Sequence, residues 1–259
     1  MVCVSGSPHN PTDHWAERIA VFLYALPNVA RMSLRVAERL GVADVITLAN
    51  ATLGVVAMAA AVLGEVALVA QLILLAAVAD GLDGIVARTH GGTEVGPYLD
   101  SMADIVSFGT APALFVFVVV NDAWGPLGDD LALFALAAGV ASLFVVFSLV
   151  RTVLYTVYVS EDENRPGIQN TLGSSILAAA YLAGVTAVPI VLVATVVLSV
   201  LMVAPVPYPK LAARDALGMG VVQMGAIVAP TAFNNLFPRV LLVAAIAYLT
   251  LAPRFYWEE

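Results

Sequence analysis

Residues 80–104 read Asp80-Gly-Leu-Asp83-Gly84-Ile-Val-Ala87-Arg88, then seven residues, then Gly96-Pro-Tyr-Leu-Asp100-Ser-Met-Ala-Asp104. Side chains three or four positions apart lie on the same face of a helix, because each residue turns the chain by about 100°. Asp80 therefore shares a face with Asp83, and Asp100 shares one with Asp104. The segment predicts two helices joined by a hairpin around His90–Thr93, with the two aspartate pairs facing each other.

The sequence on both sides of this segment is strongly apolar. Of the 259 residues, 61% are hydrophobic and 12% are charged, and the mean hydropathy is +0.95. Soluble domains carry about 25% charged residues, so this composition excludes an ordinary soluble protein. A membrane-spanning helix needs roughly 20 apolar residues. The runs that could supply such helices are Val45–Gly64, Val66–Ala79, Ile105–Val120, Leu131–Val150, Gln169–Pro209, Ala216–Ala232 and Val240–Pro253.

The run Gln169–Pro209 is too long for one span and must fold back, with Gly184–Pro189 as the expected turn. We therefore predict an all-α polytopic membrane protein with about eight transmembrane helices.

The chain divides into four parts by composition. Residues 1–31 form an N-terminal tail without a signal-peptide pattern, and native translation could instead begin at Met32. Residues 32–44 are expected to form an interfacial amphipathic helix. Residues 45–210 form the main membrane domain, which contains the aspartates, and residues 211–259 form a C-terminal extension of two membrane helices.

The basic residues predict the orientation of the chain. Placing the region before Val45 in the cytoplasm leaves only Arg239 outside, whereas the opposite topology would invert this bias. We therefore expect a multi-pass protein of the cell membrane whose aspartate segment faces the cytoplasm. The residues on the cytoplasmic side would be Arg18, Arg31, Arg35, Arg39, Arg88, Arg151, Arg165, Lys210, Arg214 and Arg254.

Four carboxylates gathered at membrane depth would repel one another, and inserting even a single charge costs about 2.5–3.5 kcal/mol. Bound divalent cations remove that cost, whereas helix packing never requires so much buried charge. Carboxylate oxygens without His or Cys suit hard cations, so we expect Mg²⁺ or Mn²⁺, with Ca²⁺ as an alternative. The candidate ligands are Asp80, Asp83, Asp100 and Asp104.

Small and cationic residues complete the segment. Gly84 and Ala87 lie on the face of the first aspartate pair, and Gly96 lies one turn before Asp100, so backbone atoms can approach a bulky ligand closely. These three residues could instead serve helix packing. Arg88 offers a guanidinium group where a phosphate would lie. The combination is typical of a pyrophosphate-binding site.

The segment resembles the signature of the CDP-alcohol phosphotransferase family, D-x2-D-G-x2-A-R-x7or8-G-x3-D-x3-D, and it matches every fixed position. The resemblance implies a two-metal site in which the first three aspartates are mainly metal ligands. Asp104 would then be the general base that accepts a proton from the acceptor hydroxyl. The resemblance also implies that Gly84, Ala87 and Gly96 contact the nucleotide, that Arg88 stabilises the CMP leaving group, and that the protein is a homodimer.

Three polar residues outside the segment are further candidates. Thr47 and Asn50 lie one turn apart in the first span, and similar positions in the family line the nucleotide pocket, although both could equally bond a neighbouring helix. Arg151 could bind the lipid phosphate or the carboxylate of serine, or it could anchor its span at the cytoplasmic interface.

The acceptor is predicted from the residues around Asp104. Asp100-Ser-Met-Ala-Asp-Ile-Val-Ser-Phe-Gly-Thr-Ala-Pro-Ala113 is similar to the serine-transferring branch of the family, the phosphatidylserine and archaetidylserine synthases, as is Leu201-Met-Val-Ala-Pro-Val-Pro-Tyr-Pro-Lys210. This resemblance implies transfer from a CDP-lipid to the hydroxyl group of L-serine, with release of CMP.

Two alternatives compete with serine transfer. Glycerol phosphate or inositol phosphate as acceptor would require more cations near the site than Arg88, Arg151 and Arg165. A cation transporter or channel would carry acidic residues throughout the membrane depth, whereas the spans outside the aspartate segment contain almost none.

The charge balance also bears on the lipid. One lysine stands against ten arginines, and the net charge is −8. An acidic, lysine-poor surface is an adaptation to high salt, although an excess of arginine over lysine also arises from GC-rich coding. We expect a halophilic archaeon as the source; the donor would then be CDP-archaeol, and otherwise CDP-diacylglycerol. The expected partners are these substrates and membrane lipid, with no nucleic acid.

Overall fold

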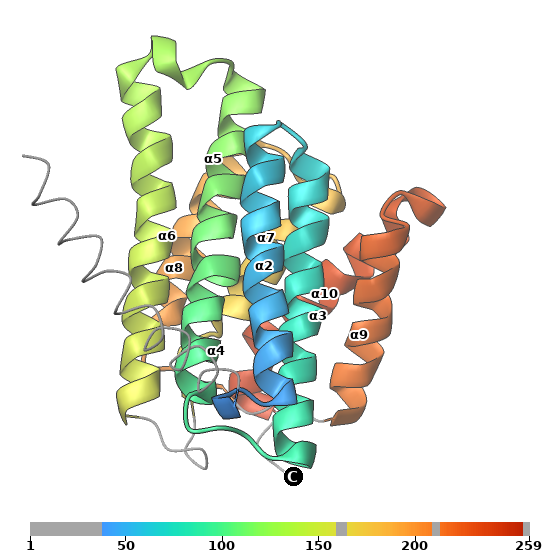
Figure 1. Ribbon diagram of the computed structural model, residues 1–259. Coiled ribbons are helices and arrows are strands. Elements are labelled where there is room, and N and C mark those ends of the chain that lie inside the picture. The colour runs from blue at the N-terminus through green and yellow to red at the C-terminus, as the bar shows by residue number, and fades with distance from the viewer. Residues whose placement is uncertain (1–37, 159–164, 209–212, 256–259) are drawn as a thin grey trace, which may run out of the picture. The chain divides into compact units, whose positions relative to one another are not determined.

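The structure is a computed structural model that describes residues 38–158, 165–208 and 213–255 (Figure 1). The chain divides into two units, Met1–Gly41 and Val42–Glu259, and the first lies almost wholly outside the described residues. The predicted tail, residues 1–31, and residues 32–37 of the predicted interfacial helix, residues 32–44, also lie outside the described residues, whereas residues 42–44 form the start of α2. The helices and strands from Val42 onward belong to the second unit.

Helices form nearly all of the described part of this unit, because its long apolar runs satisfy every backbone hydrogen bond internally as helices. In chain order the elements are α2 (Val42–Val62), α3 (Val66–His90), α4 (Gly96–Asp104), the π-helix η1 (Ile105–Thr110), α5 (Ala111–Trp124), the 3₁₀ turn η2 (Leu127–Asp129), α6 (Leu131–Tyr158), β1 (Arg165–Pro166), α7 (Asn170–Leu182), α8 (Val188–Met202), β2 (Pro207–Tyr208), α9 (Ala213–Val228) and α10 (Ala232–Phe255).

Five helical segments within the described residues are long and apolar enough to cross a membrane: Val42–Val62, Val66–His90, Gly96–Trp124, Leu131–Tyr158 and Ala232–Pro253. The expected count of about eight spans is not confirmed. Helices α7, α8 and α9 have 13, 15 and 16 residues, fewer than the roughly 20 that a straight span requires.

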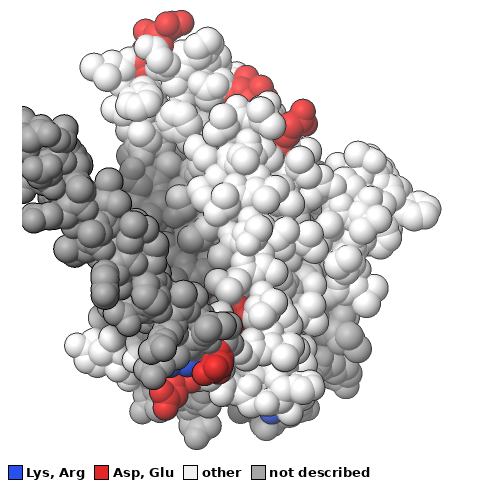
Figure 2. Space-filling model, in the orientation of Figure 1, with Lys and Arg blue, Asp and Glu red and all other residues white. Residues whose placement is uncertain are grey.

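The distribution of charge on the surface also suits a protein with membrane-spanning helices. Figure 2 shows that acidic side chains on the described part of one face gather near its two ends, with a broad and almost uncharged band between them. Large apolar side chains are exposed on several helices, including Val55, Leu131 and Val243. Such exposure suits contact with lipid rather than water.

Two predicted turns are confirmed. Helix α3 ends at His90, and α4 begins at Gly96, so the hairpin lies where the aspartate segment predicts it. Helix α7 ends at Leu182, and α8 begins at Val188, with Gly184 between them at a φ of 95°. A positive φ of this kind favours glycine and lets the chain reverse.

Helix α2 occupies a central place in the packing. It lies beside α3 and α5 in Figure 1, and it also contacts α4 and η1. Behind these helices, α7 packs against α3 and α10, and α8 packs against α6. The fully buried side chains include Phe108 of η1, Phe115 of α5 and Phe144 of α6, and the last two belong to one hydrophobic cluster.

The contact between α2 and η1 is unusually close. Ser107 of η1 donates a hydrogen bond to the backbone oxygen of Asn50, 2.8 Å away. A Cβ atom added at Gly54 would lie 2.7 Å from Ser107 Oγ and 2.8 Å from Ser107 Cα. Only glycine allows this approach, which fixes the π-helix directly after Asp104. π-Helical turns of this kind occur frequently at functional sites.

We expect Gly54→Ala to destabilise the protein by about 1–3 kcal/mol, because the added methyl group overpacks the α2–η1 contact. The measurement is the midpoint of thermal unfolding in detergent, followed by tryptophan fluorescence. Gly139→Ala is the matched control, since a Cβ atom at Gly139 of α6 meets no atom within 4 Å. Equal midpoints for the two variants would contradict the close contact.

Candidate active site and metal centre

The aspartates of α3 and α4 converge beside the hairpin that joins these helices. Oxygen atoms of Asp80, Asp83 and Asp100 lie within 4.8 Å of one another. Helix α3 supplies the first two, one turn apart, and α4 supplies the third after the loop at residues 91–95. The structure thus brings together three of the four predicted metal ligands from two helices.

Asp104, the fourth predicted aspartate, lies one turn beyond Asp100 and adjoins the same cluster. Its carboxyl group interacts electrostatically with those of Asp80 and Asp100. The Oδ1 atom of Asp104 is buried and has no hydrogen-bond partner among the described residues. A buried, unpaired carboxylate oxygen is costly, so this atom is placed to meet a bound group.

The chemistry of this donor set fits divalent cations. Carboxylate oxygens are the ligands that Mg²⁺ and Mn²⁺ prefer, and a cluster this close is repulsive unless a cation lies among the oxygens. Asp80, Asp83 and Asp100 are the residues that could hold such a cation.

Helix α2 supplies a hydroxyl group to one of these carboxylates. Thr47 is buried, and its Oγ1 donates a hydrogen bond to Asp83 Oδ2 at 2.7 Å. The bond to a neighbouring helix, one of the two interpretations of Thr47, is therefore present. It restrains the orientation of a candidate metal ligand, which is a common role for groups that bond to ligating carboxylates.

Asn50 lies one turn further along α2 and is fully buried, at 0% exposure. Neither atom of its side-chain amide has a hydrogen-bond partner among the described residues. Leaving a buried polar group unsatisfied costs about 1–3 kcal/mol. The amide of Asn50 therefore needs a partner other than the described residues, such as water or a ligand.

A fifth aspartate, Asp44, is buried next to the cluster and was missed by the sequence reasoning, which placed it in the interfacial helix. Its Oδ2 accepts a hydrogen bond from Thr93 Oγ1 at 2.8 Å, and the Thr93 hydroxyl oxygen accepts one from the backbone N–H of Gly96 at 3.0 Å. Asp44 thereby ties the α3–α4 hairpin to α2. The available signal was its position three residues before Thr47, on the same helix face.

The two motif glycines differ in their surroundings. A Cβ atom at Gly96 would lie 3.1 Å from Asp44 Oδ1, so this glycine permits the contact with α2. A Cβ atom at Gly84 would meet, within 4 Å, only the guanidinium group of Arg88 one turn away. Packing against another described helix therefore does not account for Gly84. Arg88 is exposed, and Ala87 is partly exposed.

Arg151 of α6 is buried, with its guanidinium carbon 5.1 Å from the centre of the Tyr155 ring. It interacts electrostatically with Asp104. Thr171 of α7 also reaches the cluster, because its hydroxyl group donates a hydrogen bond to Asp80 Oδ2 at 3.2 Å. No pattern in the sequence pointed to Thr171 beyond the short polar run that contains it.

Comparison with known proteins adds to this geometry. The family model described as CDP-alcohol phosphatidyltransferase matches residues 40–207. The chain is similar to an archaetidylserine synthase from Methanothermobacter thermautotrophicus, with 25% identity over 193 residues, 71% of this chain and 75% of that protein.

Two further similar proteins share shorter regions with the chain. A CDP-diacylglycerol–serine O-phosphatidyltransferase from Helicobacter pylori is 28% identical over 121 residues, 46% of this chain and 47% of that protein. A protein with the same description from Methanocaldococcus jannaschii is 35% identical over 77 residues, 29% of this chain and 35% of that protein. The five aspartates all lie within residues 40–207, whereas α9 and α10 lie beyond them.

We expect Thr47→Val to weaken Mn²⁺ binding by about 10- to 100-fold, because the Asp83 carboxylate loses the hydroxyl group that orients it. Electron paramagnetic resonance of the purified protein titrated with Mn²⁺ would measure the affinity. Thr52→Val is the matched control, since Thr52 is exposed on the same helix and bonds only the Leu48 carbonyl among the described residues. Equal affinities in both variants would contradict this role of Thr47.

Proposed function

The chain belongs to the CDP-alcohol phosphatidyltransferase family, and on this premise we propose that it transfers the phosphatidyl or archaetidyl group of a CDP-lipid to the hydroxyl group of L-serine, with release of CMP. The observation that carries the proposal is the cluster of Asp80, Asp83 and Asp100, with oxygen atoms within 4.8 Å of one another and Asp104 beside them. The names of the similar proteins support serine as the acceptor.

The first three aspartates would hold the divalent cations, Mg²⁺ or Mn²⁺, and Asp104 completes the acidic cluster. When bound, such cations neutralise the pyrophosphate of the donor and the charge that develops on the leaving group. The hydroxyl groups of Thr47 and Thr171 orient Asp83 and Asp80, respectively. The cluster is thereby held in shape before the substrates bind.

The nucleotide would lie against the small residues of the motif. Gly84 leaves space beside α3, and Ala87 carries only a methyl group. The family resemblance adds Gly96, whose Cβ side faces Asp44 of α2. The unpaired amide of Asn50 supplies a donor and an acceptor close to Thr47 on α2. A cytosine ring carries both kinds of group, so it suits such an amide.

Asp104 acts as the general base in the proposed reaction. Its carboxylate takes the proton of the serine hydroxyl, and the oxygen attacks the β-phosphorus of the CDP-lipid. A new P–O bond forms to serine as the P–O bond to CMP breaks, and CMP leaves with the bonding electrons. Arg88 stabilises the leaving phosphate, and Arg151, which interacts with Asp104, binds the lipid phosphate or the serine carboxylate.

We further propose that the enzyme is a homodimer in the cell membrane, with its active site facing the cytoplasm, where nucleotides are available. The positive-inside distribution of arginines supports this orientation. The acidic and lysine-poor composition supports a halophilic archaeal source, and with it CDP-archaeol as the natural donor.

An acceptor screen tests the assignment. Purified protein with Mg²⁺ or Mn²⁺ and either CDP-archaeol or CDP-diacylglycerol should release CMP with L-serine, and not with glycerol 3-phosphate or inositol 1-phosphate. Release of CMP with a phosphorylated acceptor alone would refute serine transfer. A lack of CMP with every acceptor would refute the transferase proposal.

We expect Asp104→Asn to lower the rate of CMP release by at least about 100-fold, because an amide cannot accept the serine proton. Binding of the CDP-lipid, measured by titration calorimetry, should remain, since Asp80, Asp83 and Asp100 are intact. Asp129→Asn, in the exposed turn after α5, should match the wild-type rate. Normal turnover by Asp104→Asn would show that another group is the base.

A further inference from the structure

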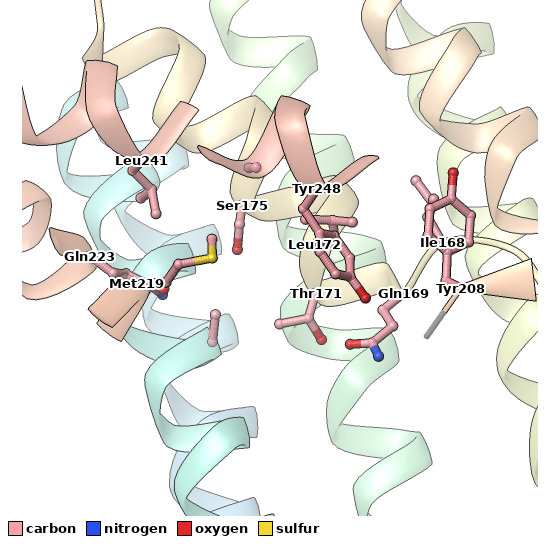
Figure 3. Close-up of a pocket in the computed structure, with 12 residues that line it drawn as sticks. Ile168, Gln169, Thr171, Leu172, Ser175, Tyr208, Met219, Gln223, Leu241 and Tyr248 are labelled. Carbon is pink, nitrogen blue, oxygen red and sulfur yellow. The ribbon is translucent and has the colours of Figure 1, made fainter. Parts of the chain in front are cut away.

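We propose that a cavity between α3, α7, α9 and α10 holds a hydrocarbon chain of the CDP-lipid donor. The inference rests on the proposed function and assigns the place where the donor's apolar part binds. The cavity has a volume of about 170 Å³. Figure 3 shows its labelled side chains, with Gln169 and Thr171 near each other and away from Met219 and Leu241.

The cavity adjoins the aspartate cluster. Thr171 lines it and also donates its hydrogen bond to Asp80, 3.2 Å away. Ala77, another lining residue, lies on α3 one turn before Asp80. A molecule whose phosphate is held at Asp80 could therefore extend directly into the cavity.

The lining changes in character with distance from the cluster. Polar groups of Gln169 and Thr171 lie at the end next to the aspartates, whereas Met219, Leu241 and Ala245 line the part formed by α9 and α10. Gln223 also lines this second part, but its amide donates a hydrogen bond to the Leu74 oxygen. A polar end beside the phosphate site and an apolar remainder match a lipid, whose head group joins directly to its chains.

The size of the cavity and the side chains around it favour a hydrocarbon chain over a nucleotide or serine as its occupant. Pockets that bury a drug-sized ligand measure about 300–1,000 Å³, so a cavity of about 170 Å³ fits a stretch of hydrocarbon better than a nucleotide. Serine is charged at both its amino and carboxyl groups, and burying it among Leu241, Ala245 and Met219 would leave those charges unpaired.

The outer wall of the cavity is held in place by hydrogen bonds to backbone oxygens. Gln223 of α9 donates to the Leu74 oxygen of α3 at 2.7 Å, and Gln71 of α3 donates to the Ile227 oxygen of α9 at 2.6 Å. Asn235 of α10 donates to the Leu182 oxygen of α7 at 2.6 Å. Since α9 and α10 lie beyond the residues that the family model matches, they add this wall to the part that carries the aspartates.

The test compares two donors, CDP-dioleoylglycerol and CDP-dihexanoylglycerol, in the CMP-release assay with L-serine. Ala245→Phe fills the cavity from α10, where Ala245 is 2% exposed. We expect this variant to lower kcat/KM for the dioleoyl donor about tenfold, the equivalent of losing the burial of a few methylene groups, while kcat/KM for the dihexanoyl donor stays unchanged. Val243→Phe is the matched control, because Val243 is 67% exposed on the same helix, and it should change neither value.

A photocrosslinking experiment on the wild-type protein gives an independent readout that does not depend on how Ala245→Phe folds. A CDP-lipid with a diazirine in its chain should label peptides that contain Met219 or Leu241, and CDP-dioleoylglycerol should compete with that labelling. Labelling confined to peptides outside the cavity, or equal labelling by a diazirine phosphatidylcholine, would overturn the proposal.

The outcomes separate this inference from the proposed function. A wild-type protein that releases CMP, together with an Ala245→Phe variant that has the wild-type ratio of kcat/KM for the two donors, would overturn the cavity assignment alone. A wild-type protein that releases no CMP from either donor or from CDP-archaeol would instead refute the transferase proposal and, with it, the inference.

Discussion

Carboxylate groups are held among apolar helices here, and the structure around them depends on how their charge is accommodated. The oxygens of Asp80, Asp83 and Asp100 lie within 4.8 Å of one another, beside Asp104. Such a cluster is unfavourable by itself at membrane depth, because each charge loses hydration and repels the others. Its cost is offset by hydrogen bonds from neighbouring hydroxyl groups and, in the proposed enzyme, by bound cations.

Helix α2 organises most of that support. Asp44, Thr47, Asn50 and Gly54 follow one another at three- or four-residue intervals and are all buried. Each has a different part: Asp44 binds the hairpin through Thr93, Thr47 bonds Asp83, Asn50 offers an unpaired amide, and Gly54 admits the π-helix. A single helix face thus links the metal ligands, the candidate nucleotide site and the backbone that follows Asp104.

Helices α9 and α10 relate to the site differently. They contribute none of the clustered aspartates. Helix α9 is joined to α3 by two hydrogen bonds, one from Gln223 of α9 to the Leu74 oxygen and one from Gln71 of α3 to the Ile227 oxygen of α9. Such bonds position a helix without the large polar cost of a buried charge. The arrangement separates the acidic part of the molecule from an apolar part that is suited to lipid.

The sequence by itself determined the apolar helical character, the hairpin between Asp83 and Asp100, and the turn at Gly184, because these depend on composition, helical period and local chain reversal. The spacing of the aspartates also predicted that the two pairs converge, because a short hairpin places the helices on its two sides next to each other. Only the tertiary structure decided the parts played by Asp44, Thr171 and Gly54. Their neighbours, Thr93, Asp80 and Ser107, are 49, 91 and 53 positions away in the chain, and helix periodicity carries no information about contacts between helices so far apart. Likewise, the apolar runs predicted helices that cross a membrane, whereas the lengths of α7, α8 and α9 depend on where packing and loops end each helix.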